Sequence, residues 1–219
     1  MAGTRDRILT ATAELFRRQG YNGTSLKQVT GAAGAPFGSL YHFFRGGKEE
    51  LGEAVIRTSG QSYLELFELI YDAAPDAATA VTDFFDGAAV VLEETGYLDA
   101  CPIGTVALEV AGTNDRLRRA TADVFASWVD AIASRFGAAG IPPARSRSLA
   151  LALVAGVEGG FMLSRAARSP EPMHSAGREL RDVVESALRS STSGRSVGRP
   201  SAGARPRAGA RSGRRTRGG

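Results

Sequence analysis

Residues 24–51 read TSLKQVTGAAGAPFGSLYHFFRGGKEEL, and this stretch decides the fold. Ser25 and Gln28 have the S-x-x-Q spacing of a capping box, which predicts the start of a helix. Gly34 stands where that helix is expected to stop, and Pro36 has the backbone angle suited to the first position of the next helix. Two short helices joined by a tight turn that contains glycine form a helix-turn-helix, whose second helix enters the DNA major groove.

The same stretch carries a family signature. Gly38, the run SLYH at 39–42 and the run KEEL at 48–51 resemble the signature of TetR-family transcriptional regulators, and the match extends over residues 5–55. The form AGAPFGSLYHFFRGGKEEL resembles most closely the LmrA/YxaF-like branch, which includes repressors of drug-export genes. A second block, CPIGTVALEV at 101–110, resembles the ligand-domain sequence of that branch.

Charge divides the chain of 219 residues into three parts. Residues 1–48 carry seven Lys or Arg against two Asp or Glu, residues 49–188 carry eleven Arg against twenty-one acids, and residues 189–219 carry nine Arg and no acid. A basic surface attracts phosphate, whereas an acidic surface repels it. We therefore expect DNA to bind the N-terminal head and not the acidic body.

The composition favours a cytoplasmic protein that associates with the nucleoid, and no membrane partner is expected. Cys101 is the only cysteine, so no internal disulfide can form. Charged residues interrupt the N-terminus, where a signal peptide would need an unbroken apolar core. The longest apolar run, residues 149–157, is too short to span a bilayer.

Helical periodicity runs through most of the chain, and no run of alternating apolar residues predicts a sheet. The predicted fold is all-α, with about nine helices arranged as a three-helix helix-turn-helix head and a helical ligand-binding and dimerisation body. The expected boundaries are 1–60 for the DNA-binding head, 61–188 for the body and 189–219 for a disordered Arg-rich tail. After the helix-turn-helix, helices are expected at about 47–71, 76–94, 105–111, 114–137, 144–167 and 172–188.

The tail from residue 189 onward is rich in Gly, Ser, Ala, Pro and Arg and has almost nothing to bury. Its arginines are expected to attract DNA phosphates without reading sequence. Residues 198–200, Gly-Arg-Pro, resemble the core of an AT-hook only faintly. A solvated tail without a role is the alternative.

The candidate DNA contacts lie in the head. Thr24 and Ser25 stand at a helix N-terminus, which they can cap and which can also accept a phosphate. The resemblance implies that Ser39, Tyr41, His42 and Lys48 contact bases or phosphates. For Tyr41 the alternative is core packing, and for His42 it is exposure without a role. The full set of candidates is Thr24, Ser25, Lys27, Phe37, Gly38, Ser39, Tyr41, His42 and Lys48.

Phe37 departs from the family pattern, in which Lys or Arg often stands at this point of the recognition helix. A basic side chain there could bind guanine through two hydrogen bonds, whereas phenylalanine can only pack on thymine methyl groups. We therefore expect a different operator preference, unless Phe37 turns inward. Gly38 beside it permits close backbone approach to a base edge, with a packing gap as the alternative.

The candidate ligand site lies in the body, where aromatic and adaptable side chains recur at helical spacing, although most residues in such a pattern are core. Glu109 and Glu158 sit inside apolar segments, and a buried carboxylate needs a partner or shifts its pKa. Each could face a cationic ligand or pair with an arginine such as Arg116, Arg118 or Arg119. The candidate ligand contacts are Phe67, Tyr71, Phe84, Trp128, Glu158, Phe161 and Met162.

These features together predict a ligand-responsive repressor that binds a palindromic operator as a homodimer and is released by a small apolar or amphipathic effector. The resemblance implies that the last two body helices form a four-helix dimer interface. Gly156, Gly159 and Gly160 are expected to allow close helix approach across that interface. The two alternatives are a general DNA-coating protein driven by the Arg-rich tail and an enzyme that acquired a DNA-binding head.

Catalysis is not expected. Cys101 and His174 could form a nucleophile–base pair, but nothing in their local sequence supports it. The sequence contains no metal-binding cluster, Walker loop or Rossmann fingerprint. Accordingly, neither a cofactor nor a metal is predicted.

Overall fold

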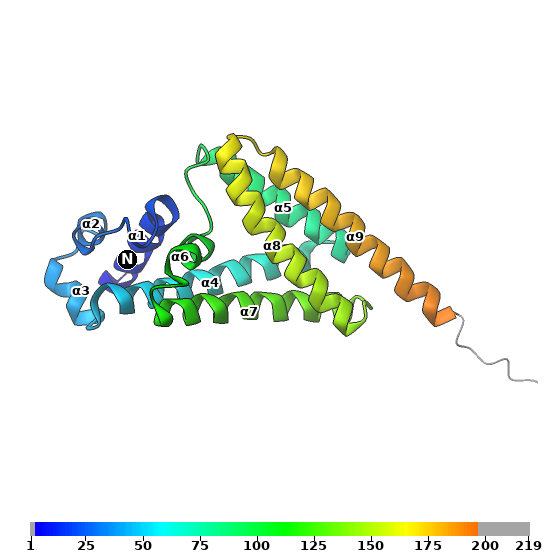
Figure 1. The fold of residues 1–219 in the computed structure, drawn as a ribbon, viewed down its shortest axis with the longest axis horizontal. Helices are drawn as coiled ribbons and strands as arrows, with labels where there is room; N and C mark the ends of the chain where they lie inside the picture. The colour runs from blue at the N-terminus through cyan, green and yellow to red at the C-terminus, as the bar shows by residue number, and fades with distance from the viewer. Residues whose placement is uncertain (1–2, 197–219) are drawn as a thin grey trace, which may run out of the picture.

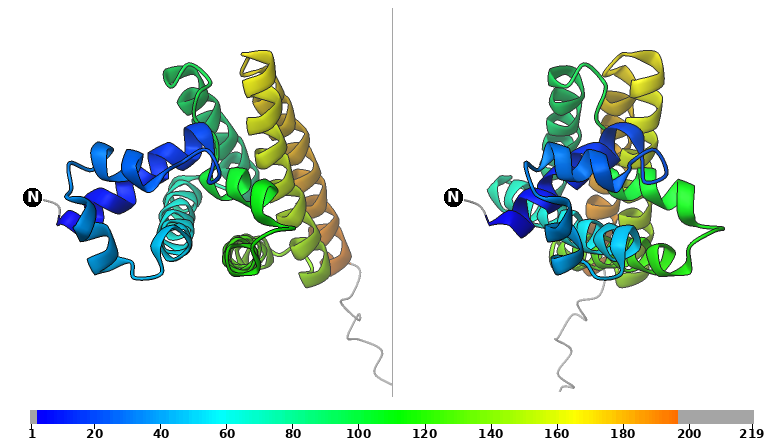
Figure 2. Two further views of the ribbon diagram at one scale, coloured as in Figure 1. Left: turned by 60° about the vertical axis from the view of Figure 1, so that its left-hand side comes forward. Right: turned by 90° about the vertical axis from the view of Figure 1, so that its left-hand side faces the viewer.

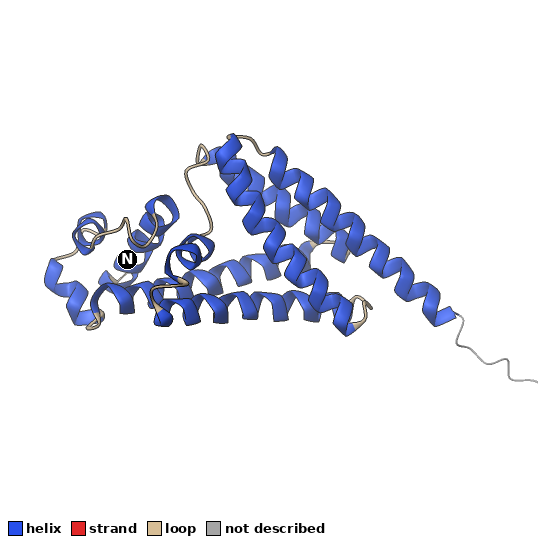
Figure 3. Cartoon of the chain, viewed as in Figure 1, coloured by secondary structure: helices blue, strands red, loops and turns tan. Residues whose placement is uncertain are grey.

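The computed structural model describes residues 3–196, with side chains up to Ser191. Within this range the chain forms nine α-helices and no strand, which confirms the all-α prediction (Figure 3). The expectations for the Arg-rich tail beyond residue 196, including the AT-hook core, lie outside the described residues.

The head consists of α1 (Thr4–Gln19), α2 (Leu26–Ala32) and α3 (Phe37–Phe43). The predicted capping box begins α2: the Ser25 hydroxyl accepts from the Gln28 amide at 3.2 Å, and the Gln28 side chain accepts from the Ser25 amide at 2.8 Å. Apolar residues of all three helices close the head core, so α1 packs against the helix-turn-helix. Those that are fully or almost fully buried include Ile8, Phe16, Val29 and Leu40, with Phe44 directly after α3.

One long helix, α4, runs from the head into the body (Figure 1). The body helices are α4 (Gly47–Ala73), α5 (Ala77–Glu94), α6 (Pro102–Val110), α7 (Asp115–Ala138), α8 (Pro143–Ala167) and α9 (Glu171–Ser196). α4 packs along α7, α8 lies between α7 and α9, and α5 packs on α9. Figure 2 shows α8 and α9 side by side at the end of the body farthest from the head.

Two core clusters follow from this arrangement. The first joins the head to α6 and to the first half of α7, through Val106, Val110 and Leu117. The second fills the body around Phe85 and Phe136, which are fully buried. The head and α6 therefore share one hydrophobic core.

Two helix ends differ from the predictions. α9 continues to Ser196, eight residues past the predicted end at Leu188, so the expected disorder of residues 189–196 is wrong. In these last turns Ser190 donates to the Ser186 carbonyl and Ser191 to the Ala187 carbonyl. α6 begins at Pro102 instead of residue 105, because proline suits the first turn of a helix.

The glycines of α8 also differ from the prediction. A Cβ at Gly160 would lie 2.7 Å from the Met173 sulfur, and a Cβ at Gly156 would lie 2.7 Å from Leu180 Cδ1. Both glycines therefore allow α8 to approach α9 of the same chain, and the expected role across a dimer is wrong for them. Gly159 has no such neighbour within 4 Å.

α8 is also the one described helix that is long and apolar enough, by composition, to cross a membrane. Its buried residues, Leu149, Ala150, Leu153 and Val157, pack in the second core cluster with α7 and α9. This packing is that of a core helix.

Candidate nucleic-acid interface and effector pocket

The outer surface of α3 presents aromatic side chains to solvent. Phe37 is 50% exposed and Tyr41 is 47% exposed, and their rings meet edge to face at 5.7 Å. Leu40 takes the inward position of the helix, so Phe37 does not turn into the core. Gly38 and His42 are also exposed. We call Phe37, Gly38, Tyr41 and His42 the recognition face.

The N-terminus of α2 places the other candidates beside this face. Ser25 and Lys27 are exposed, and Ser39 of α3 is half-buried. Thr24 differs from the expectation: it is 2% exposed, and its hydroxyl donates to the Gly20 carbonyl at 2.7 Å. Its hydroxyl therefore holds the turn after α1 and does not face solvent.

Lys48 lies at the start of α4, behind the recognition helix. Its ammonium lies 4.3 Å from the centre of the Tyr21 ring, a cation–π distance. Burial lowers the pKa of Lys48, and the carboxylate of Glu109 opposes that shift. The same lysine is thus held in place by contacts within the protein.

Five of the seven candidate ligand residues line one cavity of about 50 Å³ inside the body. They are Phe67, Phe84, Trp128, Glu158 and Phe161. Tyr63 and Cys101 also contribute to the walls, and the remaining lining is aliphatic. We call this space the inner cavity.

Tyr71 and Met162 do not line the inner cavity, so both are corrections to the predicted site. Tyr71 packs against Arg135, whose guanidinium lies 5.4 Å from the ring centre, and its hydroxyl donates to the Arg135 carbonyl. Met162 is 60% exposed. Adjacent residues of a helix point about 100° apart, so Met162 cannot share the direction of Phe161.

A second space lies beside the first. This outer cleft has a volume of about 390 Å³ and is bounded by α4, α5 and the loop before α6. Tyr63, Phe84 and Phe161 belong to the walls of both spaces. These three rings therefore separate the inner cavity from the outer cleft.

Sequence reasoning missed several wall residues, and only some of them carried a signal. Tyr63 precedes Phe67 by one helical turn, and Val154 precedes Glu158 by one turn, so helical spacing could have found both. Cys101 opens the block at 101–110 that resembles a ligand-domain sequence, so that resemblance was the signal for it, although its exact place in the wall depends on distant contacts of the loop before α6.

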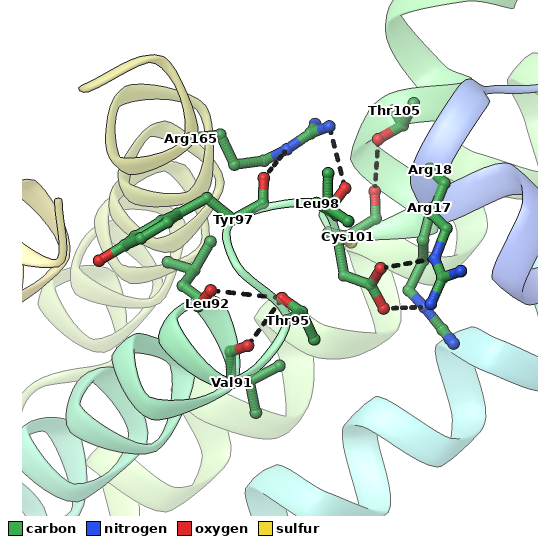
Figure 4. A network of polar contacts seen from close by, with 11 residues as sticks. Arg17, Arg18, Val91, Leu92, Thr95, Tyr97, Leu98, Cys101, Thr105 and Arg165 are labelled. Carbon is green, nitrogen blue, oxygen red and sulfur yellow. Dashed lines mark hydrogen bonds and ion pairs between the residues drawn. The ribbon is translucent and has the colours of Figure 1, made fainter. Parts of the chain in front are cut away.

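The loop between α5 and α6 bridges the head and the body. The Asp99 carboxylate pairs with Arg17 at 3.2 Å and with Arg18 at 3.1 Å, both on α1 (Figure 4). On the other side Arg165 of α8 donates to the carbonyls of residues 97 and 98. We call these contacts the Asp99 bridge. Because Arg17 and Asp99 also border the outer cleft, the bridge lies beside the candidate ligand site.

Glu109 of α6 makes a second contact between body and head. Its carboxylate accepts from the Asn22 amide at 2.7 Å and lies against Gly20. A side chain at Gly20 would collide with this carboxylate, and the φ of +75° there also favours glycine. The expected arginine partners are engaged elsewhere, Arg116 with Glu53 and Arg118 with Asp115.

Glu158 lies in the wall of the inner cavity opposite the start of α6, where its carboxylate touches Gly104. Burial raises its pKa, and a hydrogen bond from the Cys101 thiol opposes that shift. Burial raises the pKa of Cys101 well above its ordinary value, and the neighbouring Glu158 adds to this. The thiol is therefore a weak nucleophile at neutral pH. In the described part of the chain, no group of three His, Cys, Asp or Glu side chains could hold a metal ion.

Comparison with known proteins identifies the family. Residues 8–55 match the family described as bacterial regulatory proteins, tetR family, and residues 77–179 match the domain described as transcriptional regulator LmrA/YxaF-like, C-terminal domain. The chain belongs to the TetR family of transcriptional regulators, in the LmrA/YxaF-like branch. Both resemblances seen in the sequence are thereby confirmed.

Two relatives from Bacillus subtilis support this assignment, and each is similar to this chain over most of its length. The HTH-type transcriptional regulator YxaF is 32% identical over 78% of this chain and 89% of its own length. The HTH-type transcriptional regulator LmrA is 31% identical over 78% of this chain and 90% of its own length.

Solved structures agree with the fold. A TetR transcriptional regulator from Chloroflexus aurantiacus is 27% identical, with a TM-score of 0.71 over 83% of this chain and 94% of that one. Regulatory protein TetR from Rhodobacter sphaeroides is 25% identical, with a TM-score of 0.73 over 81% of this chain and 96% of that one. The TetR-family fold thus extends from the head through the body.

Proposed function

We propose that this TetR-family regulator is a homodimeric repressor that binds a palindromic operator and is released by a small apolar or amphipathic effector. It would act in the cytoplasm, on the nucleoid. The observation that carries the proposal is the Asp99 bridge, because it ties the DNA-binding head to the border of an aromatic-walled ligand site. It is joined by Glu109, which ties α6 to the turn after α1.

The recognition face supports DNA binding with sequence preference. Phe37 and Tyr41 are half-exposed aromatic side chains on the helix that enters the major groove in this motif. Phe37 would pack on thymine methyl groups, while Ser25, Lys27, Ser39, Tyr41, His42 and Lys48 would contact bases or phosphates. Exposed large apolar side chains are otherwise costly to keep on a surface, so a partner is expected to cover them.

Dimerisation is supported by an apolar stripe on α8 that no described residue covers. Leu151 and Leu163 are more than half exposed, and Gly159 lies between them with no close neighbour. Val183 of α9 and Met162 of α8 are also exposed. A second copy of the two helices would cover this stripe and place two heads on one operator.

Release follows from the length of α4. Leu51 and Val55 of α4 lie in the head core, whereas Tyr63 and Phe67 of the same helix line the inner cavity. A ligand that displaces the second pair tilts a helix whose other end carries the head. The effector lowers operator affinity only to the extent that it binds the DNA-incompetent arrangement more tightly.

Selection of bound sequences from a random DNA pool tests the proposal. The expected result is an inverted repeat whose half-sites lie about one helical turn apart, roughly 34–36 Å. The same dimer should lose this DNA when a panel of apolar and amphipathic compounds supplies an effector. Binding without sequence preference would instead indicate a general DNA-coating protein.

A further inference from the structure

Among the residues that the structure describes, Glu158 is the only carboxylate in the wall of the inner cavity. The side chains around it are aromatic or aliphatic, apart from the Cys101 thiol. Its carboxylate accepts a hydrogen bond from that thiol and lies against Gly104 in the first turn of α6. No basic side chain in the described part of the chain pairs with it.

A buried carboxyl without a cationic partner costs stability, and an apolar residue of similar size would pack more favourably. The N-terminus of α6 favours an ionised carboxylate but does not neutralise it. The arrangement is therefore complementary to a positive charge that arrives from outside the chain.

The remaining walls fit the same chemistry. Tyr63, Phe84, Trp128 and Phe161 present ring faces or edges to the inner cavity. Aromatic rings attract organic cations, and a set of rings around a small space is a recurring way to hold an ammonium group. A ring cage with one carboxylate binds an ammonium better than it binds a neutral group of the same shape.

The volumes of the two spaces suit different parts of one ligand. The inner cavity, at about 50 Å³, has room for a head group, since a water needs roughly 10–15 Å³ on the same kind of measure. The outer cleft, at about 390 Å³, is within the usual range for a small-molecule pocket. A ligand that passes between Tyr63, Phe84 and Phe161 would occupy both spaces.

We propose that the effector is an organic cation whose ammonium group lies against Glu158 in the inner cavity and whose apolar body lies in the outer cleft. This inference rests on the proposed function, because it names the ligand class of the same pocket. The aromatic rings hold the cation and the apolar body, and Glu158 selects for charge.

The alternative occupant is a neutral phenol or alcohol that accepts a hydrogen bond from protonated Glu158. The two differ in pH dependence. As the pH rises through the raised pKa of Glu158, affinity for a cation increases, whereas affinity for the neutral ligand decreases. The other titratable groups nearby are Cys101 and Tyr63, whose pKa values are both raised, and the Arg17–Asp99 ion pair at the cleft.

Two probes of the same shape test the inference. 4-Phenylbutylamine is charged at neutral pH, and 4-phenylbutan-1-ol is its neutral counterpart. Trp128 is the only tryptophan of the chain and lines the inner cavity, so its fluorescence reports binding to the full-length protein. The amine should bind about tenfold or more tightly than the alcohol, which corresponds to an ion pair in a desolvated site.

Glu158→Gln should abolish this preference while alcohol binding persists, which shows that the pocket is still folded. Glu94→Gln, which changes an exposed carboxylate at the end of α5, is the matched control and should keep the preference. Equal binding of the two probes to the unmodified protein, or no binding of the amine, overturns the inference. So does an undiminished preference in Glu158→Gln.

Operator affinity, measured in the same samples, separates this inference from the proposed function. If the amine binds with the expected preference but DNA affinity is unchanged, the ligand class stands and the regulatory function fails. If the alcohol releases DNA and the amine does not, the regulatory function stands and the ligand class is wrong.

Discussion

Two aromatic pairs with similar geometry lie in the head and in the body. The rings of Phe37 and Tyr41 meet edge to face at 5.7 Å on the surface of α3, and those of Phe67 and Phe84 meet edge to face at 5.4 Å in the wall of the inner cavity. The first pair is open to solvent, whereas Phe67 is almost fully buried. The two pairs share their contact geometry but differ in exposure, so the first is accessible to a macromolecular partner and the second only to a small ligand.

The largest expected effect comes from removing a buried ring. Phe85→Ala leaves a cavity in the second core cluster and should lower the free energy of unfolding by about 3–5 kcal/mol. Phe37→Ala removes a half-exposed ring whose edge-to-face contact is with Tyr41 on the same helix, and it should lower the free energy of unfolding by only about 0.5–1 kcal/mol. Denaturant titration of both variants measures the difference. Similar losses would mean that Phe37 supports the fold.

The neighbouring glycines of α8 give a second contrast between inside and outside. Gly160→Leu forces a side chain against Met173 and should lower the stability of the fold by about 1–3 kcal/mol. A Cβ at Gly159 meets no described atom within 4 Å, so Gly159→Leu should instead weaken the dimer, as sedimentation would report. If Gly159→Leu leaves the dimer unchanged, the apolar stripe on α8 is not the interface.

The recognition face is expected to separate sequence reading from general attraction to DNA. Phe37→Ala should reduce the preference for operator over random DNA by about 1–3 kcal/mol, because only a specific sequence offers thymine methyl groups to the ring. Lys48→Ala removes one positive charge and should weaken binding to operator DNA and to random DNA by the same factor. Binding titrations with the two DNAs provide the test. Equal losses for Phe37→Ala would exclude a reading role.

The smallest expected effect concerns the half-buried carboxylate of Glu53, which has arginine partners, in contrast to Glu158. Hydrogen bonds from Arg116 and Arg57 hold the pKa of Glu53 below its ordinary value. The resulting stabilisation is present above the unfolded-state pKa and is lost as the pH falls through the folded-state pKa. Solvent screening limits it to less than about 1 kcal/mol. Glu53→Gln should therefore slightly reduce the fall in the free energy of unfolding at acidic pH. An unchanged pH dependence at acidic pH would contradict a role of Glu53 in it.

Local signals predicted the head well. Three local features specify its helix boundaries: the capping box at Ser25, the turn at Gly34 and the helix start after Pro36. Each depends only on residues a few positions away, so each could be predicted from the local sequence. Helical spacing also identified most of the aromatic wall of the body. These features depend on contacts along one helix or between neighbouring helices.

Features that depend on distant contacts were not predictable. Asp99 contacts α1 because the loop before α6 is held between α1 on one side and Arg165 of α8 on the other. No sequence pattern near residue 99 predicts these contacts. Met162 follows a wall residue in sequence but points away from it. The end of α9 was misplaced because serine and glycine there suggested disorder, while the serine hydroxyls bond back to the helix.

The central claim is that a ligand in the body and an operator on the head influence each other through the Asp99 bridge. Operator affinity is measured by fluorescence anisotropy with and without saturating ligand, and ligand affinity by Trp128 fluorescence with and without saturating operator. We predict that ligand lowers operator affinity, and operator lowers ligand affinity, by the same factor of about 5- to 150-fold. Asp99→Asn should reduce this factor. A ligand that binds the inner cavity with the same affinity whether or not operator is bound would contradict the account.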